Sequence, residues 1–329
     1  IMPSVFLSNA NHIFNKVDEL RALTSIMSLD IICITETWLN AEIPDSAIHL
    51  PGYVVYRKDR STGQGGGVLC FVRSNVKSFM LEPANNVKHE FEILWLGIRP
   101  EILPRPVSII VVAVVYCPPW YNSEMKRNLT KTIMSGVGVI SSKYSNACFL
   151  ILGDFNSLDV KFFGRNLHFK QLVKQNTRAN KILDMIFTNF DQNFVEPSIL
   201  PPLGRSDHNC VYLSTSGVCR AAADVRIVYR RIFSNAAVDN IAKELASINW
   251  SNMYSNDDCQ QQADMLYSSL ISIVDKYMPI KTLKLKETDK PWITDYFKEL
   301  ILRRNTAFRS GDTDVYHNLR NKVYRERKI

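Results

Sequence analysis

The chain has 329 residues, of which 46% are hydrophobic and 22% are charged, with a formal net charge of +8. This length allows one large domain with an appendage, or two domains, and the composition is typical of a globular protein with a buried core. The longest apolar run, 107–116, is too short to span a bilayer, and the first residues lack the basic and apolar segments of a signal peptide. We therefore expect no membrane partner. Because the chain begins with isoleucine, we also expect it to be a piece of a longer protein.

The cysteine content indicates the redox state of the compartment, and the charge distribution indicates which classes of partner the chain can bind. There are seven cysteines, an odd number, and none forms a CxxC pair. Cys33, Cys70, Cys148 and Cys210 lie in or beside strand-like apolar runs, which predicts reduced, buried thiols in an intracellular protein. The net charge is +3 over residues 1–216 and +5 over residues 217–329. This basic balance permits a polyanionic partner.

The first third of the chain alternates strands with a helix. Apolar runs predict strands at 5–9 and 30–36, and apolar residues at helical spacing predict a helix over 16–27 between them. Two further strands, 53–56 and 68–72, flank a turn rich in glycine. No Gly-Lys-Ser/Thr follows these glycines, and the next segment is a strand, so we expect a hairpin connection there and not a nucleotide-binding loop.

The middle of the chain continues with apolar strands, and the last third changes character. Strands are predicted at 91–98, 107–116, 150–152, 182–188 and 211–213, with a helix over 123–142. Beyond residue 217 the pattern favours helices at 234–247, 257–277, 291–309 and 315–328. The last two are amphipathic and rich in lysine and arginine. They fit either a solvated face or direct contact with nucleic acid.

Polar residues follow or end the short apolar strands, where rigid backbone holds their side chains. They are Asn9, Glu36, Tyr116, Asp154, Asn156, Asp184, Asp207 and His208. Each alone fits an ordinary role: Asp154 and Asn156 an Asx turn, Glu36 a helix cap, and His208 a hydrogen-bonded structural histidine. Together they hold what metal-assisted cleavage of a phosphodiester requires. Carboxylates bind Mg²⁺, a histidine backed by a carboxylate exchanges protons, and amide and hydroxyl groups stabilise phosphoryl oxygens.

Four motifs resemble those of the endonuclease/exonuclease/phosphatase superfamily in their residue pattern and in their order along the chain. They are Ile34-Thr35-Glu36-Thr37-Trp38-Leu39, Leu152-Gly153-Asp154-Phe155-Asn156, Leu183-Asp184-Met185-Ile186-Phe187-Thr188-Asn189 and Ser206-Asp207-His208. Their residue pattern is most similar to that of the apurinic-type endonuclease domain of non-LTR retrotransposons. The segments Asn15–Leu20 and Gln64–Val68 also resemble this domain. Residues 291–294 and 316–320 resemble the region before the reverse transcriptase of those elements. No Tyr-x-Asp-Asp motif is present, so we expect a chain truncated before the polymerase.

The resemblance implies an α+β fold, a four-layer sandwich of two packed mixed sheets flanked by helices, as in DNase I. It implies a catalytic domain over residues 1–216 and a mainly helical, basic region over 217–329 that would precede a reverse transcriptase. The implied activity is Mg²⁺-dependent nicking of double-stranded DNA to leave a 3′-hydroxyl, with Mn²⁺ as a substitute metal. The implied location is intracellular, in the nucleus when the enzyme acts on DNA, and the basic C-terminal helices are a candidate contact for element RNA.

The resemblance also assigns roles. Glu36 would bind Mg²⁺, with Asn9 and Asp207 nearby as supporting ligands or as residues that orient it. His208, oriented by Asp184, would act as general base or as a hydrogen-bond partner of the transition state.

The remaining roles concern water, phosphate and DNA. Asp154 would position or deprotonate the attacking water, while Asn156 and Tyr116 would hold the scissile phosphate. The residues expected to contact DNA are Lys174, Thr177 and Arg178.

Three positions depart from the family pattern. Asn11 stands where related repair nucleases have an acid, Pro119 replaces an asparagine, and Asn176-Thr177-Arg178-Ala179 replaces the usual Pro-Thr-Arg-Gly. Two alternatives to the nuclease stay open at this stage. One is a phosphatase of the same fold, acting on phosphoinositides or other small phosphoesters. The other is a catalytically silent remnant of a mobile element that binds nucleic acid.

Overall fold

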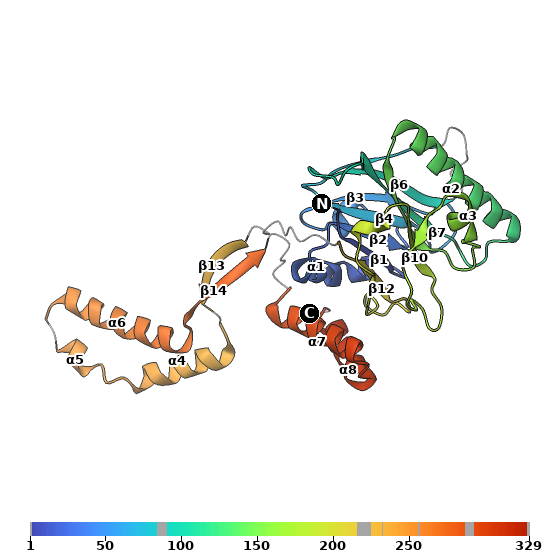
Figure 1. Ribbon diagram of the computed structural model, residues 1–329. Helices are drawn as coiled ribbons and strands as arrows, with labels where there is room; N and C mark the ends of the chain where they lie inside the picture. The colour runs from blue at the N-terminus through green and yellow to red at the C-terminus, as the bar shows by residue number, and fades with distance from the viewer. Residues whose placement is uncertain are drawn as a thin grey trace. The chain divides into compact units, whose positions relative to one another are not determined.

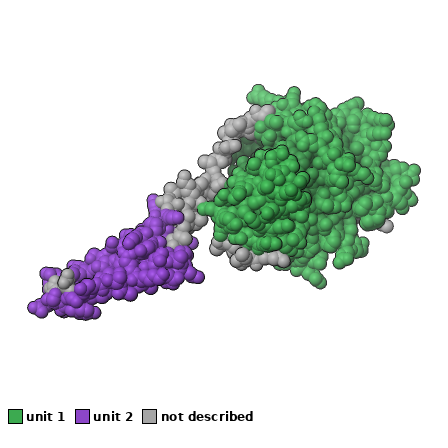
Figure 2. All heavy atoms as spheres, turned by 90° about the horizontal axis from the view of Figure 1, so that it is seen from below, with its two compact units in different colours: residues 1–221, 288–329 green, residues 222–287 purple. Residues whose placement is uncertain are grey.

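A computed structural model describes residues 2–83, 91–215, 225–231, 233–255, 257–286 and 293–327. Two compact units are present: residues 1–221 together with 288–329, and residues 222–287 (Figure 2). The predicted boundary between residues 216 and 217 lies outside the described residues, as does the start of the helix predicted from 291. Among the described residues, no helix combines the length and hydropathy needed to cross a membrane.

The first unit is built on two six-stranded mixed sheets (Figure 1). The first sheet has the strand order β11-β12-β1-β2-β4-β3. Its strands are β1 (Val5–Asn9), β2 (Ile31–Thr35), β3 (Tyr53–Lys58), β4 (Val68–Arg73), β11 (Ser198–Leu200) and β12 (Cys210–Leu213). The parallel pair β1–β2 lies at the centre, and the other pairs are antiparallel.

The second sheet has the strand order β5-β6-β7-β8-β10-β9. Its strands are β5 (Lys77–Met80), β6 (Glu92–Arg99), β7 (Ile109–Tyr116), β8 (Ala147–Asp154), β9 (Lys170–Gln171) and β10 (Asp184–Thr188). Here β7 and β8 form the parallel pair. The central strands of both sheets are buried along their whole length, which explains their continuous apolar sequences.

Alternating side chains divide the core into three layers. Leu7 of β1 and Leu150 of β8 point between the sheets, where they pack together with the other inward-facing residues. Phe6 faces the opposite way, toward α1 (Val17–Ile26). Phe149 and Ile151 face α2 (Ser123–Lys143) and α3 (Lys161–Asn166). The result is the four-layer sandwich of two sheets flanked by helices, as predicted.

Helices α7 (Asp295–Ser310) and α8 (Thr313–Glu326) belong to this first unit and pack beside α1 (Figure 1). Gly311 separates them in a left-handed conformation, φ 75°, at which glycine is the favoured residue.

The second unit contains α4 (Asn235–Ser247), α5 (Ser251–Tyr254) and α6 (Cys259–Tyr277). It also holds an antiparallel ribbon of β13 (Val225–Arg231) and β14 (Ile280–Lys286), which the sequence analysis did not predict.

Candidate active site

Four contacts join the two sheets along one edge. In each contact, one residue belongs to the first sheet or its adjoining loop and the other belongs to the second sheet. The strands meet in matched order: the segment before β12 meets β10, β1 meets β8, β2 meets β7, and the segment before β4 meets β6. Because β1 and β2 are parallel, as are β7 and β8, their carboxyl ends lie at the same edge. This edge gathers the polar residues that end the apolar strands.

The contact between β1 and β8 joins Asn9 to Asp154, whose side chains are both buried. Asn9 Nδ2 donates to Asp154 Oδ2 at 2.9 Å, and the backbone N–H of Asn156 donates to Asp154 Oδ1 at 3.0 Å. Gly153 precedes Asp154 at φ 147°, where a Cβ would overlap the carbonyl oxygen of Val115 on β7. Glycine therefore lets β8 approach β7 closely at the point where the carboxylate enters the site.

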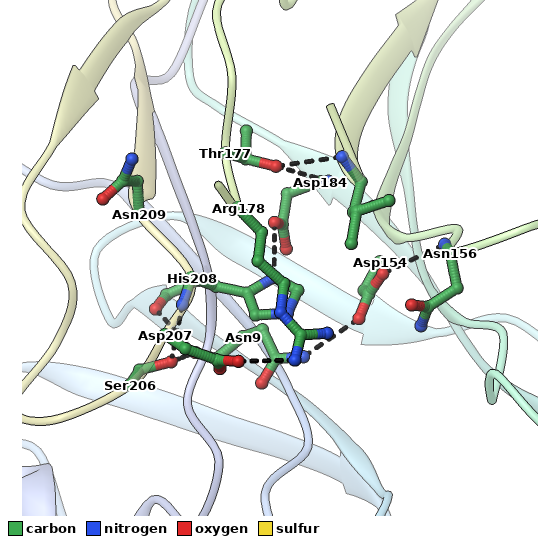
Figure 3. A network of polar contacts seen from close by, with 12 residues as sticks. Asn9, Asp154, Asn156, Thr177, Arg178, Asp184, Ser206, Asp207, His208 and Asn209 are labelled. Carbon is green, nitrogen blue, oxygen red and sulfur yellow. Dashed lines mark hydrogen bonds and ion pairs between the residues drawn. The ribbon is translucent and has the colours of Figure 1, made fainter. Parts of the chain in front are cut away.

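The contact between β10 and the segment before β12 is a buried Asp–His pair. His208 Nδ1 lies 2.7 Å from Asp184 Oδ2, and the two residues are 2% and 0% exposed (Figure 3). A carboxylate only accepts, so Nδ1 carries the proton and Nε2 takes no part in this hydrogen bond. Thr177 is also fully buried, and its hydroxyl accepts from the backbone N–H groups of Leu183 and Asp184, both at 3.0 Å. It supports the Asp184 strand end, so the structure gives it no surface for the expected DNA contact.

The contact between β2 and β7 joins Glu36 to Tyr116. Tyr116 Oη donates to Glu36 Oε1 at 2.7 Å. Burial, followed by the charge of Glu36, raises the pKa of Tyr116, so its hydroxyl stays protonated and donates. Glu36 itself has φ 50°, a left-handed conformation that is strained for a residue with a side chain. The site thus holds this carboxylate in a fixed, costly position.

The fourth contact, near Glu92, was missed by the sequence analysis. Glu92 is 5% exposed, accepts from the N–H of Gly67, and pairs with Arg60 at 2.7 Å. The carbonyls of Gly66 and Gly67 in turn accept from the backbone of the Glu36 loop. The glycine-rich turn is therefore a hairpin connection that supports this loop, as expected from the absence of a phosphate-loop motif. A charged residue inside the apolar run 91–98 was the available signal for Glu92.

The predicted DNA-contacting residues differ in exposure: Thr177 is buried, whereas the side chains of Lys174 and Arg178 are exposed. Arg178 pairs with Asp207 at 2.5 Å, and both side chains are about half exposed at the mouth of the site (Figure 3). Asp207, expected as a metal-supporting ligand, is thus engaged by arginine. Lys174 pairs at the surface with Glu196 at 3.4 Å.

The oxygen donors at this edge fit a divalent cation. One ligand atom from each of Asp154, Asp184 and His208 lies within 4.8 Å of the others. Within the described part of the chain, Asp184 Oδ1 is buried without a hydrogen-bond partner. His208 Nδ1 is engaged with Asp184, which leaves the carboxylate oxygens and His208 Nε2 as the available ligand atoms of this cluster. Carboxylate oxygens are the donors that Mg²⁺ prefers.

Burial and crowding of carboxylates shift two pKa values in ways that suit proton transfer. Burial, reinforced by the charge of Asp184, raises the pKa of Asp154 to about 7. Burial alone would lower the pKa of His208, but its hydrogen bond to Asp184 and the neighbouring carboxylates outweigh that effect and raise it. Near neutral pH the site therefore holds one group that can accept a proton and one that can donate.

Known proteins resemble the chain mainly in fold. No curated protein sequence is significantly similar to it. The catalytic domain of Xenopus laevis APE2 superposes with a TM-score of 0.50 at 17% identity, covering 64% of this chain and 91% of that one. The 3′–5′ exonuclease NExo of Neisseria meningitidis has a TM-score of 0.50 at 15% identity, covering 64% and 99%. The endonuclease domain of TRAS1, a telomere-specific non-LTR retrotransposon, has a TM-score of 0.46 at 15% identity, covering 64% and 96%.

The family assignment rests on the sequence itself. The model of the endonuclease/exonuclease/phosphatase family matches residues 7–208, which is more than half of the chain and runs from β1 to His208. Both sheets that deliver the polar edge lie almost wholly within this match. The chain belongs to the endonuclease/exonuclease/phosphatase family.

Proposed function

We propose that the chain is a Mg²⁺-dependent endonuclease that nicks double-stranded DNA to leave a 3′-hydroxyl, as in target-primed retrotransposition. The observation that carries this proposal is the row of cross-sheet pairs Asn9–Asp154, Glu36–Tyr116 and Asp184–His208. These pairs bring a proton acceptor, a proton donor and an anionic metal ligand to one edge. Metal-assisted hydrolysis of a phosphodiester uses all three.

In the proposed reaction, water attacks the phosphorus in line with the bond to the 3′ oxygen. Asp154 takes a proton from the attacking water, the P–O3′ bond breaks, and the departing 3′ oxygen takes a proton from solvent. The products are a 3′-hydroxyl and a 5′-phosphate. The raised pKa of about 7 makes Asp154 an efficient acceptor near neutral pH. Asn9 holds the second oxygen of this carboxylate and so fixes its direction.

His208 acts in this scheme as the hydrogen-bond donor to the phosphoryl oxygens. Its raised pKa favours the protonated ring, in which Nε2 donates while Nδ1 stays on Asp184. This favours the second of the two roles open from the sequence. Asn156 and Tyr116 also hold the phosphate, and Glu36 with Asn9 would hold the Mg²⁺ ion. When bound, the ion supplies positive charge that stabilises the developing negative charge on the leaving oxygen.

The surroundings of the site favour a nucleic acid over a small phosphoester. Trp120 is 63% exposed and Trp38 is 37% exposed, and both lie in loops that follow site residues. The guanidinium of Arg60 stands 5.8 Å from the centroids of the Tyr116 and Trp120 rings. Exposed aromatic rings beside arginine provide stacking surfaces for bases, and Arg178 at the mouth offers a charge for a flanking phosphate. A phosphoinositide phosphatase would not need these stacking surfaces.

The intact proton-transfer pairs also argue against a silent remnant. A site released from function has no reason to retain two buried carboxylates, whose desolvation is costly without a catalytic role. Acting on chromosomal DNA would place the protein in the nucleus of a eukaryotic cell. Contact of the basic helices α7 and α8 with element RNA remains a separate proposal, supported by their lysine and arginine content.

The end chemistry of the product tests this function against the phosphatase alternative. Plasmid treated with the chain and Mg²⁺ is offered to a DNA polymerase, which extends only a 3′-hydroxyl. We expect direct extension from the nick and no release of inorganic phosphate from phosphoinositides. Nicks that need removal of a 3′-phosphate before extension, or phosphate release without nicking, would contradict the proposal.

A further inference from the structure

The helical hairpin α7–α8 forms part of the core of the nuclease unit, although it lies beyond the family match that ends at residue 208. Phe297, Ile301 and Val323 are at most 2% exposed and share a buried cluster with Leu20 of α1 and Phe6 of β1. Figure 1 shows the hairpin, in red, beside α1, in blue. An appendage serving only as a connection would not need to bury this apolar surface.

A buried ion pair fixes the position of the hairpin against α1. Arg304 Nη1 of α7 lies 2.5 Å from Glu19 Oε1 of α1, and each side chain is 2% exposed. Arg304 also donates to the side chain of Asn305 at 3.0 Å. Sliding the hairpin along α1 would leave two unpaired charges in the core, which is strongly unfavourable. The position of α8 relative to the catalytic domain is thereby set.

The last turn of α8 reaches the loop that carries the catalytic histidine. The guanidinium carbon of Arg205 lies 3.8 Å from the centroid of the Tyr324 ring. The next residue, Ser206, donates through its hydroxyl to the carbonyl of Asn9 at 2.7 Å and accepts from the N–H of His208 at 3.3 Å. A continuous set of contacts therefore runs from Tyr324 to Asn9 and His208.

A buried lysine also contacts the loop after β1 and the loop before His208. Lys16 is 7% exposed, and burial lowers its pKa to about 8. Its ammonium donates to the carbonyls of Ala10 and Asn11, the latter at 2.9 Å. At Gly204 a Cβ would lie 3.0 Å from the Lys16 Cε, so the two segments are in close contact. The Lys16 side chain therefore packs against both loops and links them.

We propose that the α7–α8 hairpin is a positioning element of the active site, and that Tyr324 acts through Arg205 to hold the Ser206–His208 loop in its reactive geometry. Tyr324 touches no reacting atom, so it is a positioning residue. Its kinetic consequence rests on the proposed nuclease function. Its structural consequence, the rigidity of the loop, does not.

The test compares three variants in the full chain. Tyr324→Ala removes the ring on which Arg205 stacks, and Tyr324→Phe keeps the ring but loses the hydroxyl. Tyr296→Ala is the matched control, because Tyr296 lies on the same hairpin and is 54% exposed. Two readouts are taken: hydrogen exchange of the backbone amides of residues 203–210, with the amides of β7 as internal reference, and steady-state nicking kinetics.

We expect Tyr324→Ala to speed exchange at residues 203–210 by about fivefold, the ratio for losing one cation–π contact of about 1 kcal/mol. Exchange in β7 should not change. The kcat for nicking should fall by a similar factor with KM unchanged, because the loop orients His208 and does not bind the bulk of the DNA. Tyr324→Phe, which keeps the ring under Arg205, should change exchange at residues 203–210 less than Tyr324→Ala does.

Unchanged loop exchange in Tyr324→Ala would overturn the inference, as would an equal effect of Tyr296→Ala. A wild-type chain that shows no nicking would sink the proposed function instead. In that case the exchange measurement still decides whether Tyr324 holds the loop.

Discussion

His208 Nδ1 and Asp184 Oδ2 lie 2.7 Å apart, fully enclosed, and they join the two sheets of the sandwich. The pair does more than orient an imidazole. Asp184 also faces the Asp154 position directly in the β8–β10 register, so its charge acts on both proton-transfer groups. Removing that charge should change the behaviour of both groups.

Asp184→Asn should therefore reduce kcat and shift its pH dependence. Asparagine can accept from Nδ1 but carries no charge, so the cost to kcat should be about 10²–10⁴-fold, as for other oriented histidines. In the proposed reaction, nicking requires ionised Asp154 and protonated His208, so the rate should rise and then fall with increasing pH. Loss of Asp184 removes the main influence that raises the pKa of His208, and the alkaline limb should move to lower pH.

Nicking rates measured from pH 5 to 9 at saturating Mg²⁺ check this expectation. Asp159→Asn, an exposed carboxylate change in the loop after β8, is the control. An alkaline limb that stays in place in Asp184→Asn would show that His208 is not the group being titrated.

Asp154→Asn should abolish nicking and yet stabilise the protein at high pH. The pKa of Asp154 in the folded chain, about 7, is above its ordinary value of 3.8, so the folded state binds the proton more tightly than the unfolded state. Wild-type stability must then fall as pH rises from about 4 to about 7, by up to roughly 4 kcal/mol from this group. Asparagine lacks this titration and can still accept from the N–H of Asn156.

Urea unfolding at pH 4.5 and pH 8 in the presence of EDTA measures the effect without bound metal. The free energy of unfolding of Asp154→Asn minus that of the wild type should be larger at pH 8 than at pH 4.5. If the free energy of unfolding depends on pH in the same way in both proteins, then folding does not raise the pKa of Asp154.

The pair Arg304–Glu19 should be among the most sensitive positions for stability. Arg304→Ala leaves Glu19 charged and buried, so we expect a loss of about 3–5 kcal/mol in the free energy of unfolding. The double variant Arg304→Met, Glu19→Leu should recover much of this loss, because no charge then remains in the core. Arg303→Ala is the neighbouring control, since its side chain is 64% exposed and its loss should change stability by about 0.5 kcal/mol or less.

Chemical denaturation of the four proteins provides the comparison. If Arg304→Ala is no more destabilising than Arg303→Ala, then α7 is not anchored on α1 as described.

Glu36→Ala should raise the Mg²⁺ concentration required for half-maximal nicking. Losing one anionic ligand worth at least about 1.4 kcal/mol corresponds to at least about a tenfold increase. Glu42→Ala, an exposed carboxylate change in the same loop, should leave the titration unchanged. An identical Mg²⁺ titration for Glu36→Ala and wild type would remove Glu36 from the ligand set.

Most strands of the endonuclease/exonuclease/phosphatase fold could be predicted from the sequence, because they are buried on both faces and read as continuous apolar runs. The ribbon β13–β14 was missed, although residues 282–286 within β14 alternate polar and apolar residues in the strand pattern. Its basic side chains were taken as part of a helical region. The packing of α7 against α1 could not be predicted either, since a contact between Glu19 and Arg304 has no local signature.

For the site, the strand ends predicted which residues would gather, and the contacts among them come from the structure. Two positions behave differently from expectation: Thr177 supports Asp184 from the interior, and Asp207 pairs with Arg178. Both depend on side-chain direction in a loop, which residue spacing does not determine. Ser206, which was quoted in one of the four motifs, and Glu92 were given no role because their partners, Asn9 and Gly67, lie far away in the sequence.

The central claim is that this edge of the sandwich cleaves DNA, and supercoiled plasmid tests it most directly. Wild-type chain and His208→Ala are incubated with plasmid in Mg²⁺ or in EDTA, and open circles are counted over time. We predict nicking by the wild type only with Mg²⁺, and a rate at least about 10²-fold lower for His208→Ala. Absence of Mg²⁺-dependent nicking in the wild type would contradict the function, and nicking undiminished in His208→Ala would contradict the site.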